Sequence, residues 1–289
     1  MPRRASGTTG IEMDGRIGPL LTSETCDALR AAARDGVTCL RCSLDLGLST
    51  IDVAVDGQGW EAAGRRFPHP RKYRERTIYH WREESGTFEP LARYTTALVK
   101  LVPTPWGAPT FEIDGIKMLP TAQVSPFEDA ARKVRLVGPQ GRVVLDTCAG
   151  LGYFAHWCLA EGAAQVLSFE KSADVLWLRE HNPWSPGPDP RLVLRHEDIT
   201  RAIGALPTGS IDACLHDPPR FGIAGELYSQ SFYDELARVM RRGGRLFHYT
   251  GTPNRLTTGR DVPREVAVRL RRAGFQAELQ GDGVLARLK

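Results

Sequence analysis

The feature that most constrains the fold is a regular alternation of strand-like and helix-like segments in the second half of the chain. Short apolar runs such as "RVVLDT", "QVLSFE" and "SIDACLH" alternate with longer segments such as "YFAHWCLAEG" and "SFYDELARVM". Such alternation predicts a doubly wound, mostly parallel sheet with helices on both faces. The last two runs, "FQAELQ" and "VLARLK", are separated by only Gly281-Asp282-Gly283, so they are expected to be antiparallel. We therefore predict an α/β fold.

The first half has a different pattern. From about residue 20 to 120 the segments resemble strands, with one short helix expected near Glu24–Ala33. Asp114-Gly115 lies between two β-like flanks, which is a strong signal for a two-residue hairpin. We expect this half to form a smaller β-rich or α+β unit.

A helix start marks the boundary between the two halves. Ser125 is suited to be the N-cap and Pro126 the first helical residue, and the helix is expected to run to about Val134. We therefore predict two domains, over 1–124 and 125–289.

Composition limits the class of protein. With 42% hydrophobic and 25% charged residues, the chain has enough apolar material for a core and is not expected to be disordered. The start, "MPRRASGTTG", has no apolar run behind its arginines, so we do not expect it to be a secretory signal. No stretch approaches the ~18 apolar residues of a membrane span. We expect a cytoplasmic protein that does not enter a membrane, and the net charge of +4 permits a nucleic-acid partner without requiring one.

The six cysteines do not suggest a disulfide framework in a chain of this size, so we expect reduced thiols. Cys39 and Cys42 form a lone C-x-x-C, which can indicate metal or redox chemistry. However, Leu40 and Cys42 alternate with Arg41 as in a half-buried strand, which places the two thiols on opposite sides. We interpret both cysteines as structural and expect no metal site.

A glycine loop after the first strand of the α/β half suggests a binding site for a nucleotide-like ligand. Asp146, Gly150 and Gly152 form the pattern D-x-x-x-G-x-G between a strand and a helix, where glycines allow a tight turn and close approach of a ligand. Twenty residues after Gly150, Glu170 ends the next strand, where an acid can accept hydrogen bonds from ribose hydroxyls. Position 155 is alanine, so the third glycine of a dinucleotide fingerprint is missing.

Asp198 ends the third strand of this half, in "RHEDIT". An acid at this place can accept a hydrogen bond from an adenine amino group. The alternative is a purely structural role as the N-cap of the next helix.

The stretch "LHDPPRFG" follows the fourth strand. Pro218 and Pro219 end that strand because neither has an N–H for a ladder bond. Asp217 is thereby fixed at the carboxyl edge of the sheet, where ligands bind in open α/β folds.

With these residues in place, the C-terminal part of the chain resembles a class I S-adenosylmethionine-dependent methyltransferase. The segments "LDTCAGLGY", "HNPWS", "HDPPRFGIAGELYS" and "GGRLFHYTG" are similar to a family of predicted methyltransferases best known from archaea, and "SLDLG" and "EIDGIKM" extend the resemblance to the N-terminal half. It implies a Rossmann-like class I methyltransferase fold with a seven-stranded sheet whose last strand is antiparallel, and S-adenosylmethionine as cofactor. The residues expected at the cofactor are Asp146, Thr147, Ala149, Gly150, Gly152, Tyr153, Glu170, Lys171, Asp198, Ile199 and Asp217.

Methyl transfer to an amine or a hydroxyl group needs a group that accepts or orients a proton. Asp217, His216, His248 and Tyr249 all end strands on the ligand edge and are candidates, although either histidine can instead be a hydrogen-bonded structural residue. Further candidates on the loop after the fourth strand are Arg220, which can clamp an anion or pair with Glu226, and Tyr228, which is preferred to Tyr233 as a pocket residue.

The motif Asp217-Pro218-Pro219-Arg220 resembles two groups of methyltransferases. Enzymes that methylate exocyclic amines of bases carry an aromatic residue where this chain has Arg220, with Phe221 one place later. RNA uracil methyltransferases carry the same four residues but need a nucleophilic cysteine downstream. No cysteine follows Cys214, which excludes the uracil chemistry.

Three functions remain open at this stage. The first is a methyltransferase acting on an N–H or O–H nucleophile of a small molecule or an RNA base. The second is an enzyme that uses the same cofactor for aminopropyl transfer or for cleavage or cyclisation of the aminobutyrate arm. The third is an RNA-binding protein without catalysis, for which residues 61–82 give seven Lys and Arg, two acids and interleaved aromatics, although a solvated surface is slightly favoured there. We leave a homodimer open.

Overall fold

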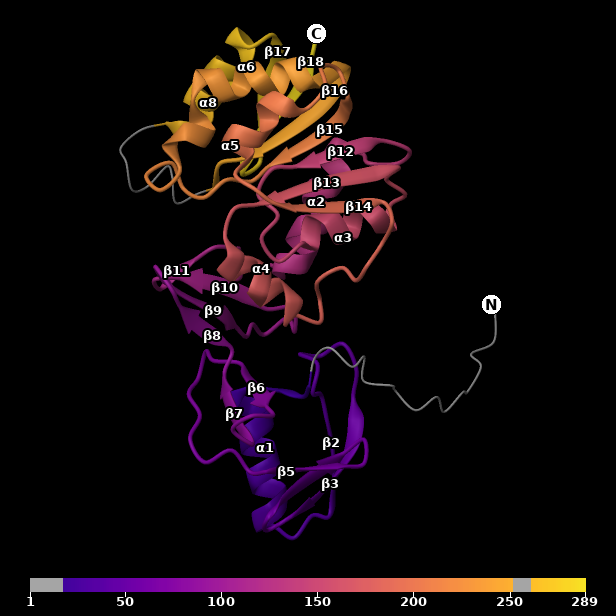
Figure 1. The fold of residues 1–289 in the computed structure, drawn as a ribbon, viewed down its shortest axis with the longest axis vertical. Coiled ribbons are helices and arrows are strands. Elements are labelled where there is room, and N and C mark those ends of the chain that lie inside the picture. Colours follow the sequence, from indigo (N-terminus) through magenta and orange to yellow (C-terminus); the bar gives the residue numbers. More distant parts are fainter. Residues whose placement is uncertain (1–17, 252–260) are drawn as a thin grey trace.

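The computed structural model describes residues 18–251 and 261–289, so the start "MPRRASGTTG" lies outside the described residues. Within the described ranges, no helix has the length and apolar character that a membrane span requires. The seven-stranded sheet with its helices and the smaller β-rich part lie at opposite ends of the molecule (Figure 1).

The second half forms one seven-stranded sheet, as predicted. Its strand order is β14-β13-β12-β15-β16-β18-β17, and all neighbours are parallel except the pairs made by β18, which is antiparallel to both β16 and β17. The strands are β12 (Val143–Asp146), β13 (Gln165–Glu170), β14 (Leu192–His196), β15 (Ile211–His216), β16 (Met240–Tyr249), β17 (Phe275–Gln280) and β18 (Gly283–Leu288).

Helices cover both faces of this sheet and create two apolar cores. One core packs α2 and α3 on the sheet through residues such as Val134 and Phe154, and the other packs α6 and α8 through Leu236 and Val266. The helices are α2 (Pro126–Val137), α3 (Tyr153–Ala160), α4 (Ala173–Glu180), α5 (Ile199–Ala202), η1 (Ile203–Ala205), η2 (Gly225–Tyr228), α6 (Gln230–Val239) and α8 (Val262–Arg272).

The start of α2 is where the sequence predicts it. The Ser125 hydroxyl accepts a hydrogen bond from the Phe127 amide, and Pro126 opens the helix. The helix continues to Val137, three residues beyond the predicted end, because Gly138 supplies the left-handed C-cap with φ of 61°.

The first half is built from small antiparallel sheets, in agreement with its predicted β-rich or α+β character. Among its described residues, from 18 onward, the helix α1 (Ser23–Arg34) covers the predicted range. The strands are β1 (Leu20–Leu21), β2 (Cys39–Cys42), β3 (Ile51–Asp56), β4 (Gly59–Ala62), β5 (Arg65–Pro68), β6 (Tyr79–Arg82), β7 (Thr87–Pro90), β8 (Ala92–Tyr94), β9 (Leu98–Val102), β10 (Thr110–Ile113) and β11 (Ile116–Lys117), arranged as β1-β6-β7, β2-β3-β4-β5 and β8-β9-β10-β11.

Two predicted local features are present in these sheets. Asp114 and Gly115 join β10 to β11 with φ of 48° and 77°, the positive values that a two-residue hairpin turn needs. Cys39 is exposed and Cys42 half-buried on β2, and all six cysteines of the chain are free thiols. The sheet β8–β11 lies between the large sheet and the rest of the first half, which brings its hairpin to the carboxyl edge of the large sheet (Figure 1).

Candidate functional site

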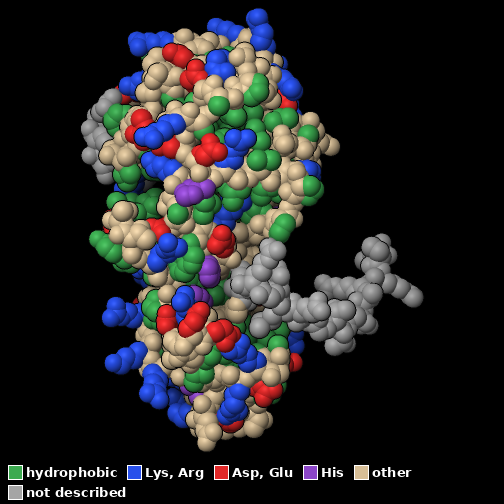
Figure 2. Space-filling view, in the orientation of Figure 1, with side chains coloured by type: hydrophobic (Ala, Val, Ile, Leu, Met, Phe, Trp, Pro, Cys, Tyr) green, Lys and Arg blue, Asp and Glu red, His purple; other side chains and the backbone are tan. Residues whose placement is uncertain are grey.

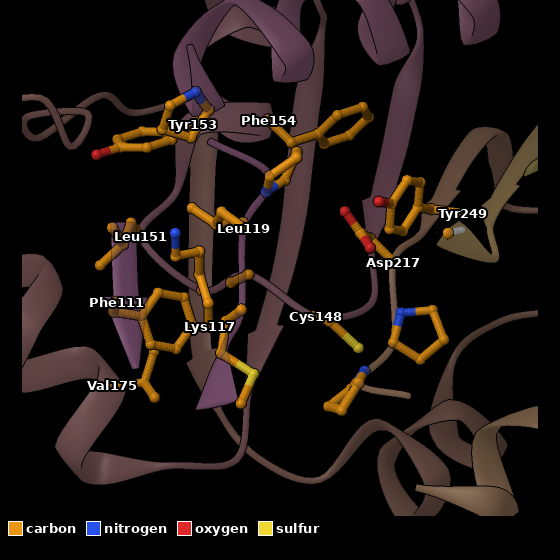
Figure 3. A pocket seen from close by; sticks show the side chains of 18 of the residues that line it. Phe111, Lys117, Leu119, Cys148, Leu151, Tyr153, Phe154, Val175, Asp217 and Tyr249 are labelled. Carbon is orange, nitrogen blue, oxygen red and sulfur yellow. The ribbon is translucent and has the colours of Figure 1, made fainter. Parts of the chain in front are cut away.

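A cavity of about 720 Å³ opens at the carboxyl edge of the seven-stranded sheet. Its floor is formed by the glycine loop after β12, the ends of β13, β15 and β16, and the inner side of α2. Its roof is the hairpin β10–β11 and the segment that follows it. Figure 3 shows Asp217 and Tyr249 side by side at one end, and Phe111, Lys117 and Leu119 toward the other.

The glycine loop fixes the acid at the end of β13. The Gly150 amide donates to Oε2 of Glu170 at 3.0 Å, and the Ser172 amide donates to Oε1 at 2.9 Å. Burial raises the pKa of the Glu170 carboxyl. Ala149, Gly150, Gly152 and Glu170 all line the cavity, where their sequence pattern predicted a ligand.

Gly152 is required by a neighbour beneath the loop. It has φ of 82°, and a Cβ at this position would lie 2.5 Å from Cζ of Arg179. The Arg179 side chain is buried, and its two terminal nitrogens have no hydrogen-bond partner among the described residues. The second glycine of the loop thus leaves space for a buried guanidinium, which sequence reasoning did not identify.

Asp217 belongs to a buried network that the sequence did not reveal. Its Oδ2 accepts a hydrogen bond of 2.7 Å from Nζ of Lys133, whose side chain is 3% exposed. The same Nζ lies 3.0 Å from Oδ2 of Asp129 and 3.7 Å from the centroid of the Tyr249 ring. All four residues line the cavity, so the end of the fourth strand is an ion-paired cluster rather than a lone carboxylate.

The cluster extends to the turn between β17 and β18. Arg132 donates at 2.8 Å to Oδ1 of Asp129 and at 2.7 Å to Oδ2 of Asp282. The backbone oxygen of Asp282 accepts from the amides of Thr250 and Gly251. Charged side chains therefore tie helix α2 to the end of β15 and to the β17–β18 turn, both at the carboxyl edge of the sheet.

His216 and His248 do not line the cavity. The ring nitrogens of His216 bond to Thr147 Oγ1 at 2.8 Å and to the Leu227 oxygen at 2.9 Å. Those of His248 bond to Tyr233 Oη at 2.9 Å and to the Tyr249 oxygen at 3.0 Å.

Burial keeps both histidines neutral. It lowers the pKa of His216 to about 4 and that of His248 well below its usual value. The structure therefore places both histidines in the core as hydrogen-bonded structural residues, which was the alternative to a place at the reactive edge in the sequence analysis.

Tyr228 also lies in the core, contrary to the expectation of a pocket residue. Its hydroxyl donates to the Pro219 oxygen at 3.0 Å, and its ring packs in the core beside α6. This bond holds the Pro218-Pro219 turn on the side that faces the core. Of the tyrosines near the fourth and fifth strands, Tyr249 is the one that lines the cavity, and burial raises the pKa of its hydroxyl to about 12.

Asp146 and Thr147 lie beneath the glycine loop rather than at the cavity. Ser168 donates to Asp146 Oδ2 at 2.5 Å, and burial raises the pKa of this carboxyl to about 6. The Thr147 hydroxyl lies 3.2 Å from the Leu215 oxygen and bonds to His216. Both side chains support the loop from below.

Asp198 caps a helix, which was the structural alternative in the sequence analysis. Its Oδ1 accepts from the Thr200 amide at 2.9 Å and from the Thr200 hydroxyl at 2.7 Å, and it opens α5. Neither Asp198 nor Ile199 lines the cavity, and Ile199 packs in the core.

Tyr153 lines the cavity with its ring but directs its hydroxyl away from it. The hydroxyl donates to the Pro109 oxygen at 2.8 Å and accepts from Asn182 Nδ2 at 3.0 Å. These bonds join the glycine loop and α3 to the segment that leads into the roof strand β10.

Exposed cations surround the cavity mouth. Lys171 lies 3.7 Å from Glu226, so this acid pairs with Lys171 and not with Arg220 as one alternative held. Arg220 is exposed and makes no ion pair within residues 18–251 and 261–289. Lys117 donates to the Thr121 hydroxyl at 2.7 Å.

Four of the seven basic residues in segment 61–82 pair with acidic side chains of the protein: Arg65, Arg66, Arg76 and Arg82. Arg65 pairs with Glu83 and Arg66 with Asp56, while the ring of Phe67 is buried. Acidic and basic side chains are interspersed on the face that Figure 2 shows. These contacts favour the solvated-surface interpretation of the segment.

Comparison with known proteins supplies one sequence relative. No model of a known protein family matches the chain. An uncharacterized protein of Methanocaldococcus jannaschii, MJ1233, is 43% identical over 180 residues. The match covers 61% of this chain and 61% of the relative, so the chain spans less than two thirds of that protein.

Solved structures similar to this one support the fold. Spermidine synthase in complex with the transition-state analogue AdoDATO has a TM-score of 0.56 at 14% identity, and spermidine synthase from Thermotoga maritima has 0.55 at 12%; each covers 75% of this chain and 80% of its own. An S-adenosylmethionine-dependent methyltransferase from Mesorhizobium loti covers 55% of this chain with a TM-score of 0.41. Together with the strand order, the first two similarities show a Rossmann-like class I methyltransferase fold.

Proposed function

We propose that the protein is an S-adenosylmethionine-dependent methyltransferase. The observation that carries this proposal is the continuous cavity from the glycine loop and Glu170 at one part of the floor to Asp217 at another. The residues present fit the cofactor, because Gly150 leaves the backbone open toward the cavity residue Phe111 and the Glu170 carboxylate lies where ribose hydroxyls need an acceptor.

In this proposal the cofactor is held by the residues that line the floor. Glu170 accepts from the ribose, Ala149, Gly150 and Gly152 provide close backbone contact, and Tyr153 and Lys171 border the site. The bound cofactor supplies a methyl group on a sulfonium. Asp146, Thr147, Asp198 and Ile199 act indirectly, by supporting the loop or the strand end.

The acceptor is an N–H or O–H nucleophile of a small molecule or an RNA base. Asp217 and the Pro218 oxygen follow the fourth strand, and we assign them the task of orienting the nucleophile. Arg220 and Tyr249 are the other cavity residues retained from the predicted catalytic set. His216, His248 and Tyr228 have structural roles in this proposal, because their polar atoms bond within the core.

We also propose that residues 1–124 form a substrate or accessory domain and that 125–289 form the cofactor domain. The contribution of β10 and β11 to the roof supports a role for the first half at the acceptor side. Membership of the predicted archaeal methyltransferase family is proposed on the quoted motifs and is in line with the similarity to MJ1233.

The alternative is a different use of the same cofactor, by aminopropyl transfer or by cleavage of the aminobutyrate arm. The similarity to spermidine synthases reaches 75% of the chain and thus extends into the first half. At 12–14% identity it concerns the fold, so the alternative is not favoured.

Calorimetric titration and product analysis together test the proposal. We expect S-adenosylmethionine to bind at least as tightly as its decarboxylated form. With S-adenosylmethionine and an extract of small molecules and RNA, we expect S-adenosylhomocysteine as product. Methylthioadenosine would identify the alternative, and failure to bind either S-adenosylmethionine or S-adenosylhomocysteine would overturn the proposal in favour of a protein without this catalysis.

A further inference from the structure

Two carboxylates share one buried lysine at the end of the fourth strand. Lys133 Nζ lies 2.7 Å from Asp217 Oδ2 and 3.0 Å from Asp129 Oδ2, and the Tyr249 ring covers it. The other carboxylate oxygen of Asp217, Oδ1, receives no hydrogen bond from the described residues, although Asp217 lines the cavity. One oxygen of Asp217 is therefore fixed by the protein and the other is available to a ligand.

The charges of this cluster do not cancel. Asp129, Asp217 and Lys133 carry two negative charges and one positive charge, and the adjoining pair of Arg132 and Asp282 adds no net charge. One negative charge is thus left at this end of the cavity, where Asp129 and Lys133 are buried and the Asp217 side chain is 21% exposed. Such a site disfavours an anionic nucleophile and favours an acceptor that becomes positive as it reacts.

We propose that Lys133 is a positioning residue that holds Asp217 charged with Oδ1 turned to the reacting atoms, that Asp129 is a positioning residue for Lys133, and that the acceptor atom is an amine nitrogen. The proposal rests on the proposed methyltransferase function. Lys133 fixes the orientation of Asp217 by binding Oδ2, and Asp129 fixes Lys133 in turn.

The chemistry of an amine acceptor fits this arrangement. A neutral amine attacks the methyl carbon with its lone pair, the N–C bond forms, and the C–S bond breaks with its electron pair left on sulfur. The positive charge therefore moves from sulfur to nitrogen, next to Asp217 Oδ1. One N–H proton then passes to Asp217 or to water, so that no other reactant is needed.

Sinefungin provides a probe that needs no knowledge of the acceptor, because this cofactor analogue carries a charged amine in place of the sulfonium methyl group. We expect the wild-type protein at pH 7.5 to bind sinefungin about ten- to a hundredfold more tightly than S-adenosylhomocysteine, the range of one charge-assisted hydrogen bond. The preference for sinefungin over S-adenosylhomocysteine should decrease at low pH, because Asp217 becomes protonated there. Asp217→Asn should remove it without weakening S-adenosylhomocysteine.

The pH at which the preference is half lost identifies the role of the other two residues. Burial raises the pKa of Asp217, Lys133 lowers it, and Asp129 and Asp282 raise it. Lys133→Met should therefore move the midpoint to higher pH, and Asp129→Asn should move it to lower pH. The ionisable groups that face Asp217 from other elements are unchanged in both variants: Tyr249, Asp282, Asp146 and Cys148.

Lys100→Met is the matched control, because Lys100 pairs with Glu112 at 3.2 Å outside the cavity and its loss should not move the midpoint. If the Lys133→Met protein does not fold, Asp129→Asn alone tests the positioning role. That role is overturned if the pH at which the sinefungin preference is half lost does not move in Asp129→Asn. A wild-type protein that binds both ligands equally at every pH overturns the inference and leaves the proposed function intact. A wild-type protein that binds neither ligand overturns both.

Discussion

Glu170→Gln tests the cofactor site at the residue where the geometry is most explicit. In the wild-type protein both carboxylate oxygens accept a backbone amide, from Gly150 at 3.0 Å and from Ser172 at 2.9 Å. Both oxygens keep further lone pairs for the two ribose hydroxyls. A glutamine has one oxygen and one NH₂ group, so it must present a donor to one of these amides and loses the acceptor for one hydroxyl.

The size of the effect follows from these bonds. A hydrogen bond to a charged group contributes about 1.5–3 kcal/mol, and each 1.4 kcal/mol is a factor of ten in Kd. We therefore expect Glu170→Gln to weaken S-adenosylmethionine and S-adenosylhomocysteine alike, by about ten- to a hundredfold. Isothermal titration at pH 8 measures both values.

The pH dependence gives the same test a second readout. Because burial raises the pKa of Glu170 above its usual value, the wild-type affinity should begin to fall at a higher pH than an ordinary glutamate would cause. Below that pH the protonated carboxyl resembles the glutamine, so the variant should lack this dependence. Glu197→Gln is the control, since Glu197 is exposed and pairs with Arg195 at 3.7 Å. Wild-type Kd values in a folded Glu170→Gln protein would refute the assignment of the ribose acid.

Three further variants probe the loop and the reactive end. Asp217→Asn should leave the Kd of S-adenosylmethionine nearly unchanged and lower the rate of S-adenosylhomocysteine formation by a factor of about 10²–10⁴. Normal turnover would show that "HDPPRFG" is only a stiff turn. Gly152→Ala introduces a Cβ 2.5 Å from Arg179 Cζ at φ of 82°, so the free energy of unfolding in urea should fall by about 1–3 kcal/mol, and an unchanged value would contradict the packing. Tyr228→Phe removes the donor to the Pro219 oxygen, so the free energy of unfolding in urea should fall by about 0.5–1.5 kcal/mol and turnover should be slower. Unchanged stability and turnover would show that this bond does not hold the turn.

The sheet could be predicted from the sequence because each of its elements carries its own local signal. Apolar runs with helical segments between them specify parallel strands with crossovers, and the short Gly281-Asp282-Gly283 connection specifies the antiparallel end. The glycine loop and Glu170 lie together at the cavity for the same reason, since the end of a parallel strand defines one edge of the sheet, and their contact with a cofactor stays a prediction.

Of the two roles that the sequence left open for His216 and His248, the structural one applies, and the alternation of side chains along a strand gives the reason. Neighbouring residues of a strand point to opposite faces. His216 precedes Asp217 and His248 precedes Tyr249, so when the second member of each pair turns to the cavity and α2, the first turns to the core beside α6.

Lys133 and Asp129 required knowledge of how α2 packs. The sequence predicted the start and the approximate end of this helix, and only its packing against β15 and β16 brings these charges to the end of the fourth strand. One signal was nevertheless present. Lys133 falls in the apolar stripe of Ala130, Val134 and Val137, where a charged residue needs a buried partner.

The division of the cavity between a floor on the large sheet and a roof on the hairpin β10–β11 has an evolutionary consequence. The hairpin hydrogen-bonds within its own four-stranded sheet and shares no ladder with the seven strands below it. Residues such as Ile116 and Lys117 can therefore be exchanged without disturbing the register that positions Glu170 and Asp217. Under the proposed function, a lineage of such proteins can change its acceptor through substitutions in a few roof residues while residues 125–289 keep the proposed cofactor site.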